Sequence, residues 1–343
     1  MNDLHETARA LVAEGKGILA ADESTGTIKK RFDSIGLEST EDTRRAYREL
    51  LFTTPGAEEY ISGVILYDET IRQSASDGTP FPKLLESKGI IPGIKVDEGA
   101  KPLALSDRPD GETITEGLDG LRARLDEYRE LGARFAKWRA TYSIAADKPS
   151  EYCVWTNAHA LARYAALCQE AGIVPIVEPE VLQDGTHTIE QSSKATGRVL
   201  QAVYTELHDQ RIEFRGTLLK PNMVLSGYEA ADRASAEEVA EVTLECFYKH
   251  VPAAVPGIVF LSGGQSDEDA TAHLNAMNAR GSHPWQLSFS YGRALQAPAL
   301  KAWGGKQENV EAAQRAYSHR AKMNGAARTG MYAPEMEREA VTA

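Results

Sequence analysis

The stretch GTLLKPNMV, residues 216–224, is an apolar run of strand length with a lysine near its centre and a proline directly after the lysine. A lysine in such a run either carries its charge out of the core along its flexible stem, or lies inside with a perturbed pKa and a chemical task. Which of the two holds for Lys220 depends on the residues that the fold places around it.

Seven further runs of the same β-rich character are distributed along the chain. Helical spacing separates them; in residues 119–131, for example, Leu121, Leu125 and Tyr128 share one face. Strand-like segments that alternate with helices predict a parallel α/β protein, and eight of them in this length favour a closed (β/α)8 TIM barrel. The other seven runs are residues 17–22, 63–70, 90–99, 133–141, 172–182, 257–266 and 286–295.

The domain organisation follows from the same pattern. No linker interrupts the eight units, so residues 1–343 are expected to form a single barrel domain. Residues 325–343 lose the apolar periodicity and are expected to form a loosely ordered C-terminal tail. An open dinucleotide-binding sheet is disfavoured because no GxGxxG motif lies between a first strand and its helix.

The composition is that of a soluble globular protein, with 42% hydrophobic and 26% charged residues. The apolar stretches are far shorter than the roughly 20 residues of a membrane-spanning helix. The N-terminus lacks the basic start and apolar middle of a signal peptide. Three widely spaced cysteines, Cys153, Cys168 and Cys246, suggest free thiols in a reducing compartment. A cytoplasmic protein without a membrane partner is therefore expected.

The net charge of -12 argues against a nucleic-acid surface, which needs a broad basic face. Small phosphorylated ligands remain possible, since a few cations in a cleft can attract a dianion to an acidic protein. The eight histidines are scattered without an HxH or HxxxH arrangement, so no metal site is predicted.

Ionic residues gather where the predicted strands end, and in a barrel these carboxyl ends meet at one face. Side chains alternate along a strand, so Lys137 and Arg139 are expected to face the barrel axis together, as are Glu178 and Glu180. So many charges make a wholly structural explanation difficult. Those expected at this face are Asp22, Asp68, Lys95, Lys137, Arg139, Glu178, Glu180, Lys220, Ser262, Gly263, Ser290 and Arg293; for Asp68 and for Asp97 a structural pair or a solvated strand end is the expectation.

In this setting Lys220 is a candidate nucleophile. An amine that attacks at neutral pH needs its pKa brought from ~10.4 to ~7–8, which corresponds to about 4 kcal/mol, and burial beside Lys137 acts in that direction. Attack on a ketone gives a Schiff base, which withdraws electrons so that an adjacent carbon–carbon bond can break. Glu178 or Glu180 would transfer the protons, and Asp22 is a candidate base for the substrate hydroxyl.

Two motifs after the seventh and eighth strands suit a phosphate group. In LSGGQS, which contains Ser262 and Gly263, glycines allow close backbone approach before a helix, and in SYGR, Arg293 offers a bidentate fork. Taken singly, Gly263 or Gly264 is equally well explained as a residue of a simple turn. LSGGQ also matches the signature of ABC transporter ATPases, but the chain contains no GxxxxGK[ST] loop.

Together these segments resemble class I fructose-bisphosphate aldolases, the Schiff-base type, from about residue 5 to about residue 320. The resemblance implies reversible cleavage of fructose 1,6-bisphosphate to dihydroxyacetone phosphate and glyceraldehyde 3-phosphate, no metal or cofactor, and a homotetramer. It rests on the segments GKGILAADESTGTIKKRF, GIKVDEG, FAKWR, ARYAALCQEAGIVPIVEPE, GTLLKPNMV, FLSGGQS and SYGRALQAPALKAWGGK.

The resemblance also implies roles for single residues. Lys220 matches the Schiff-base lysine, Glu178 resembles the main acid/base residue with Glu180 beside it, and Asp22 and Lys137 match further catalytic positions. Substrate contacts are implied for Arg139, for Ser262, Gly263, Arg293 and Arg31 at one phosphate, and for Lys95, Ser24 and Thr27 at the other. Thr27 stands where the animal enzymes have serine, Glu98 replaces a lysine, and the terminal tyrosine of the animal enzymes is absent, the last tyrosine being Tyr332.

Two other functions are compatible with parts of the sequence. One is a catalytically idle phosphosugar-binding scaffold that keeps the barrel for partner contacts, against which the intact Lys220, Glu178 and Asp22 argue. The other is a different Schiff-base barrel such as a transaldolase, which the two phosphate motifs disfavour.

Overall fold

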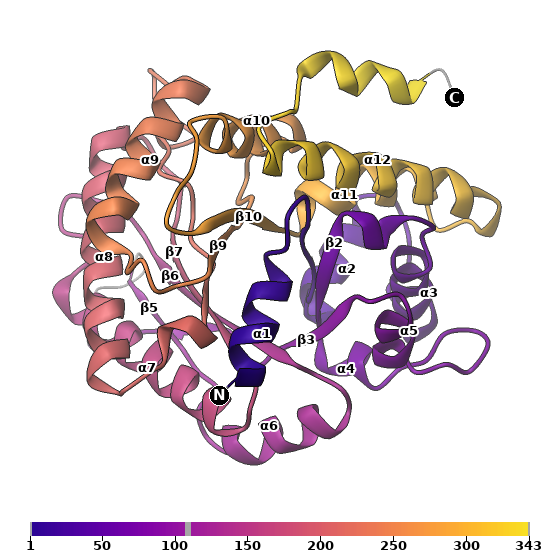
Figure 1. The fold of residues 1–343 in the computed structure, drawn as a ribbon, viewed down its shortest axis with the longest axis horizontal. Coiled ribbons are helices and arrows are strands. Elements are labelled where there is room, and N and C mark those ends of the chain that lie inside the picture. Colours follow the sequence, from indigo (N-terminus) through magenta and orange to yellow (C-terminus); the bar gives the residue numbers. More distant parts are fainter. Residues whose placement is uncertain (1, 107–110, 342–343) are drawn as a thin grey trace.

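The computed structural model describes residues 2–106 and 111–341 and shows eight parallel strands that close into a barrel (Figure 1). The strands follow one another around the barrel in the order β1-β10-β9-β8-β7-β6-β3-β2. Each of the eight predicted runs overlaps one barrel strand, so the predicted fold is confirmed. The strands are β1 (Gly17–Ala21), β2 (Ile61–Leu66), β3 (Ile91–Lys95), β6 (Phe135–Tyr142), β7 (Val174–Val181), β8 (Leu218–Leu219), β9 (Gly257–Phe260) and β10 (Gln286–Tyr291).

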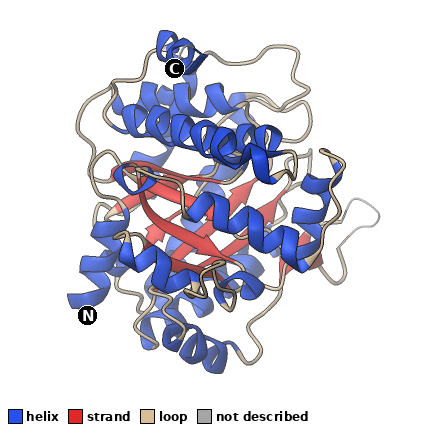
Figure 2. Cartoon of the chain, turned by 90° about the vertical axis from the view of Figure 1, so that its right-hand side faces the viewer, coloured by secondary structure: helices blue, strands red, loops and turns tan. Residues whose placement is uncertain are grey.

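Helices cover the outside of the barrel, as Figure 2 shows from the side, and the first helix lies at its amino-terminal end. They are α1 (Asn2–Leu11), α2 (Thr25–Asp33), α3 (Glu41–Phe52), α4 (Asp68–Ile71), α5 (Phe81–Ser87), α6 (Leu121–Glu130), α7 (Glu151–Glu170), α8 (Ile189–Asp209), α9 (Ala236–His250), α10 (Asp267–Asn278), α11 (Arg293–Trp303) and α12 (Val310–Arg328). Short 3-10 helices are η1 (Ala57–Glu59), η2 (Phe214–Gly216), η3 (Gln307–Asn309) and η4 (Pro334–Val341). Within the described ranges, no helix is long and apolar enough to cross a membrane.

The core has two layers, because each strand is buried on both of its faces. On β1, Ile18 and Ala20 point into the barrel and pack with Phe135 and Ile176, while Leu19 and Ala21 belong to the outer layer between strands and helices. This burial explains why the strands appear in the sequence as continuous apolar runs. The three cysteines are free, as expected, and all three are buried.

One element has no counterpart among the predicted strands. A small antiparallel hairpin, β4 (Ala100–Pro102) with β5 (Thr113–Thr115), branches off after β3. Its strands have three residues each and β4 is exposed, so they carry no apolar run that the sequence could reveal.

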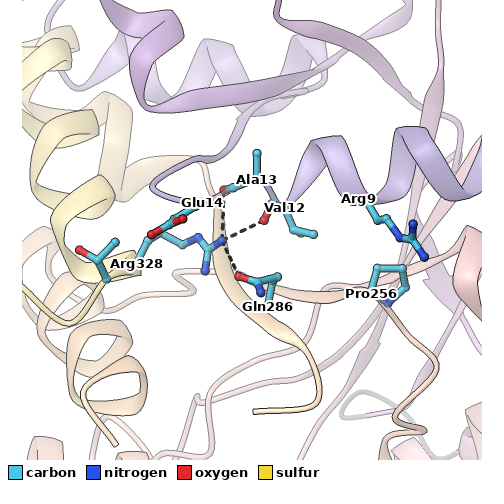
Figure 3. Close-up of a pocket in the computed structure, with 8 residues that line it drawn as sticks. Arg9, Val12, Ala13, Glu14, Pro256, Gln286 and Arg328 are labelled. Atoms are coloured by element: carbon cyan, nitrogen blue, oxygen red, sulfur yellow. Dashed lines mark hydrogen bonds between the residues drawn. The ribbon is translucent and has the colours of Figure 1, made fainter. Parts of the chain in front are cut away.

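Helix α1 closes the amino-terminal end of the barrel, where Arg328 connects it to α12 and β10. The Arg328 guanidinium donates to the carbonyl oxygens of Val12 (2.9 Å) and Ala13 (3.2 Å) and to Gln286 Oε1 (3.3 Å), as shown in Figure 3. Burial lowers the pKa of Arg328 to about 10, which still leaves it protonated at neutral pH. The residues that make these contacts line a cavity of about 670 Å³. Because Gln286 is the first residue of β10, this cavity lies at the amino-terminal end of the barrel, opposite Lys220.

Replacing Arg328 with Met should lower the free energy of unfolding by about 3 kcal/mol, because the buried carbonyls would lose charged hydrogen-bond donors. The measurement is the midpoint of urea unfolding. Arg9→Met is the control, since Arg9 lines the same cavity but is exposed, and its substitution should change the stability by no more than about 0.5 kcal/mol. Equal midpoints for the two variants would contradict the anchoring role of Arg328.

The predicted tail, residues 325–343, begins with the last turn of α12, and η4 follows it. The Glu337 carboxylate anchors η4 by accepting hydrogen bonds from Arg320 (2.5 Å), His319 (2.7 Å) and Tyr332 (3.1 Å). The hydroxyl of the last tyrosine is therefore engaged within the tail. Residues 342–343 of the predicted tail lie outside the described residues.

Candidate active site

A cavity of about 1070 Å³ opens at the carboxyl ends of the strands, the face at which the sequence predicts the site. Every predicted site residue lines it. They come from the segment after β1 (Asp22, Ser24), from α2 (Thr27, Arg31), from β3 (Lys95), from β6 (Lys137, Arg139), from β7 (Glu178, Glu180), and from the segments that follow β8, β9 and β10 (Lys220, Ser262, Gly263, Arg293).

The centre of the cavity contains two buried lysines that share one carboxylate. Lys220 directly follows β8, and its Nζ lies 3.2 Å from Glu178 Oε1. The other oxygen of Glu178 lies 3.3 Å from Lys137 Nζ. Lys137 also contacts Asp22 at 2.7 Å and Asp97 at 3.7 Å. Lys220 is therefore held inside the barrel among ionised groups, rather than extending its charge into solvent.

The surroundings fix the ionisation of two members of this group. Burial opposes charge on Lys137, but the carboxylates of Asp22, Glu178 and Asp97 outweigh it and raise the pKa of Lys137 well above its usual range. Burial also opposes charge on Asp22, where Lys137 and then Lys220 prevail and hold the pKa of this carboxyl well below its usual range. At neutral pH Lys137 is thus an ammonium and Asp22 a carboxylate, so Lys137 is unsuited to act as a free amine.

Glu178 has the geometry of a proton-transfer group. It is buried, and its Oε2 has no hydrogen-bond partner among the described residues although Lys137 Nζ lies 3.3 Å away. A carboxylate oxygen that forms an ion pair but no hydrogen bond can still accept a proton or a hydrogen bond from a bound molecule. Glu180, two residues further along β7, is instead paired with Arg139, which lies on the neighbouring strand β6.

The sequence predicts structural pairs for two aspartates, and both form ion pairs. Asp97 is buried and contacts Lys95 at 2.7 Å as well as Lys137. Asp68 is partly exposed and pairs with Arg72 at 2.9 Å. Asp97 therefore links two of the lysines that line the cavity.

Two groups suited to phosphate lie at the mouth of the cavity. After β9, Ser262 and Gly263 form a turn, and Arg293, the first residue of α11, donates to the carbonyl oxygen of Gly263. Ser24 caps helix α2 by accepting from the Thr27 N–H at 3.4 Å. Lys95 lines the same cavity, so cations are present at several points around its wall.

One important residue was missed by the sequence analysis. Glu23 is buried and forms ion pairs with Arg31 and with Arg48, the latter at 2.6 Å, and it accepts from Gln296 Nε2 at 3.0 Å. Burial opposes charge on Glu23, yet Arg48 and then Arg31 lower its pKa. Glu23 holds Arg31 at the cavity wall, and its partners are too distant along the chain for the sequence to reveal the contact.

No group of three or more His, Cys, Asp or Glu side chains that could hold a metal ion is found in residues 2–106 and 111–341. The cavity thus holds buried amines among carboxylates, with cations on its wall that suit a phosphorylated ligand.

Comparisons with known proteins show the family of this chain. The family model described as glycolytic, fructose-bisphosphate aldolase class-I matches residues 3–343. A probable fructose-bisphosphate aldolase class 1 from Xanthomonas campestris is 58% identical over 97% of this chain and 99% of its own. The cytosolic fructose-bisphosphate aldolase 6 of Arabidopsis thaliana is 55% identical over 96% of this chain and 92% of its own.

A solved structure gives the same result for the fold. The fructose-bisphosphate aldolase of Plasmodium falciparum superposes with a TM-score of 0.95 and 49% sequence identity, covering 97% of this chain and 95% of that one. The similarity therefore extends through the whole barrel and is not confined to single motifs.

Proposed function

The chain belongs to the class I fructose-bisphosphate aldolase family, and we propose which of its side chains carry out the reaction of that family. The reaction is the reversible cleavage of fructose 1,6-bisphosphate to dihydroxyacetone phosphate and glyceraldehyde 3-phosphate. One carbon–carbon bond breaks, between C3 and C4 of the sugar, and neither product is oxidised or reduced. The protein must therefore supply an electron acceptor at C2 and groups that move protons.

Lys220 supplies the electron acceptor. Its Nζ attacks the C2 carbonyl of the open-chain sugar, water leaves, and a protonated imine links C2 to the lysine. Supporting this assignment, Lys220 is buried at the centre of the cavity, whereas the carboxylates around Lys137 keep that second amine charged.

Glu178 moves the protons. Loss of water from the first adduct requires a proton donor, and cleavage requires that the hydroxyl on C4 lose its proton while the C3–C4 electrons pass to the imine nitrogen. Glu178 lies 3.2 Å from the Lys220 amine, and its other oxygen has no hydrogen-bond partner among the described residues. The enamine that remains takes up a proton at C3, and hydrolysis then releases dihydroxyacetone phosphate.

The position of Asp22 at a strand end suggests a base for the substrate hydroxyl, but its charge favours a role in orienting that hydroxyl. Lys137 and Lys220 hold its pKa low despite its burial, and a carboxylate with a low pKa is a weak proton acceptor. We therefore assign to Asp22 the orientation of the C4 hydroxyl through a hydrogen bond, and to Lys137 the neutralisation of charge that develops there.

The two phosphates of the substrate fit the two groups at the mouth. Ser262, Gly263 and Arg293 follow the last two strands, where barrel enzymes commonly bind phosphate. Lys95, Ser24 and Thr27 would hold the other phosphate, with Arg31 and Arg139 completing the cationic wall. Binding at both ends would fix the C2 carbonyl near Lys220, a contribution to rate that comes from positioning.

The observation that carries this proposal is the buried Lys220 amine 3.2 Å from Glu178. Borohydride added in the presence of dihydroxyacetone phosphate should fix one reduced adduct, and peptide mass mapping should place it on Lys220. Lys137 and Lys95, in the same cavity, serve as internal controls. An adduct on either of them, or no adduct, would refute the assignment.

We also propose that the protein acts in the cytoplasm, in glycolysis and gluconeogenesis, as a homotetramer. The name of the Arabidopsis relative, which is cytosolic, supports the location, and the glycolytic description of the family supports the pathway. Light scattering of the purified protein would test whether it is a tetramer.

A catalytically idle scaffold is disfavoured because Lys220, Glu178, Lys137 and Asp22 are all present and in contact as a group. Turnover in a coupled assay would exclude such a scaffold.

A further inference from the structure

The turn at the predicted phosphate site has two possible backbone orientations. The Ser262 carbonyl oxygen accepts from the Gln265 N–H at 3.2 Å, so Gly263 and Gly264 are the central residues of a four-residue turn. Gly263 has a φ of +57°, and Gly264 is not in the positive-φ region. This is the pattern of a type II′ turn, and rotation of the central peptide would convert it to type I′, which two glycines also permit.

Two side chains hold this central peptide from opposite ends. Arg293 donates to its carbonyl oxygen, which belongs to Gly263. Its N–H, which belongs to Gly264, donates to the phenolic oxygen of Tyr228 at 2.5 Å. Since both polar atoms of the peptide are engaged, rotation of the peptide would break both hydrogen bonds.

Tyr228 itself stands on a well-fixed loop. The backbone after β8 is joined to the loop after β7 by three hydrogen bonds: Gly227 N–H to His187 O (2.8 Å), Tyr228 N–H to Gln183 O (2.9 Å) and Glu229 N–H to Gly185 O (3.0 Å). Tyr228 is thereby positioned by two loops of the barrel against the turn that follows β9.

The contact between Tyr228 and the turn leaves no free space. A Cβ atom added to Gly264 would lie 2.8 Å from the Tyr228 phenolic oxygen and 2.8 Å from the carbon that carries it. The tyrosine ring therefore rests directly on the glycine backbone. The phenol accepts the Gly264 N–H and keeps its own hydrogen, which it can donate to an anion.

We propose that Tyr228 is a positioning residue for the phosphate site, because it fixes the Gly263–Gly264 peptide in the orientation that presents this turn and Arg293 to the substrate phosphate. The inference rests on the proposed function, which places a phosphate of the sugar beside Ser262, Gly263 and Arg293. Tyr228 belongs to the binding step, while bond cleavage depends on Lys220 and Glu178.

Tyr228→Phe tests this role, since it retains the ring and removes only the hydroxyl. The concentration of dihydroxyacetone phosphate that half-saturates borohydride trapping should rise about tenfold, the effect of about one lost hydrogen bond. Trapping by unphosphorylated dihydroxyacetone should be unchanged, because it makes no use of the phosphate site. Tyr152→Phe, on the exposed face of α7, is the control and should match the unmodified protein with both ligands.

Either of two results would overturn the proposal: unchanged half-saturation by dihydroxyacetone phosphate, or an equal loss with both ligands, which indicates a general structural role. Gly264→Ala disturbs the same contact with Tyr228 from the side of the turn, and it should weaken saturation by dihydroxyacetone phosphate while leaving dihydroxyacetone unaffected.

If the unmodified protein forms no adduct, the proposed function fails. The role of Tyr228 is still tested by calorimetry with dihydroxyacetone phosphate, in which Tyr228→Phe added to Lys220→Met should weaken binding about tenfold.

Discussion

Replacing Lys220 with Met is expected to reduce the turnover of fructose 1,6-bisphosphate at least about 10⁴-fold. Methionine fills a similar volume, but it cannot form the imine that accepts the C3–C4 electrons. Glu178 keeps Lys137 as a neighbour at 3.3 Å, so the substitution leaves no isolated buried carboxylate. A coupled assay of triose phosphate release measures the loss, and circular dichroism checks that the barrel remains folded.

Lys137→Met is the matched control, because it removes the other buried amine of the same cavity. Lys137 contacts three carboxylates, so its loss should lower the melting temperature well below that of Lys220→Met. Activity in Lys220→Met above about one hundredth of the unmodified level would show that the amine is not the electron acceptor. Equal melting temperatures for the two variants would contradict the distinct electrostatic roles assigned to the two lysines.

The barrel could be predicted from the sequence because its strands are buried on both faces and therefore appear as continuous apolar runs. Predicted and observed ends differ most at β8, where the run covers residues 216–224 and the strand only Leu218–Leu219. The chain beyond β8 stays buried while leaving the ladder, so hydrophobicity alone could not mark the end of the strand. The β4 and β5 hairpin offered no apolar signal at all.

The residues of the site could be predicted because they stand where strands end, and alternation along β6 and β7 indicated which side chains face inward. Their partners could not. That Glu178 lies between two lysines depends on the register of three strands, and the ion pair of Glu23 with Arg48 depends on the packing of α3. Tyr228 was missed for the same reason, since its contact with Gly264 joins two loops that are remote in sequence.

Replacing Glu178 with Gln is expected to lower kcat about 10³-fold, within the range found when a general acid/base is removed. The amide retains the shape of the side chain but cannot take up the proton that the C4 hydroxyl releases. The amide also cannot donate the proton that loss of water from the first adduct requires, so formation of the trapped adduct at Lys220, 3.2 Å away, should slow as well. Steady-state kinetics with fructose 1,6-bisphosphate and the rate of borohydride trapping measure the two effects.

Glu180→Gln distinguishes proton transfer from a general loss of negative charge. Glu180 lies on the same strand, but its carboxylate is already paired with Arg139. Its substitution should therefore act on the position of Arg139 and cost about tenfold in kcat/KM, mainly through KM. Because the two variants remove the same charge from the same strand, only the group that transfers protons should show a large loss in kcat. A loss in Glu180→Gln as large as that in Glu178→Gln would mean that the proton passes through Glu180 and that Glu178 serves to bridge the two lysines.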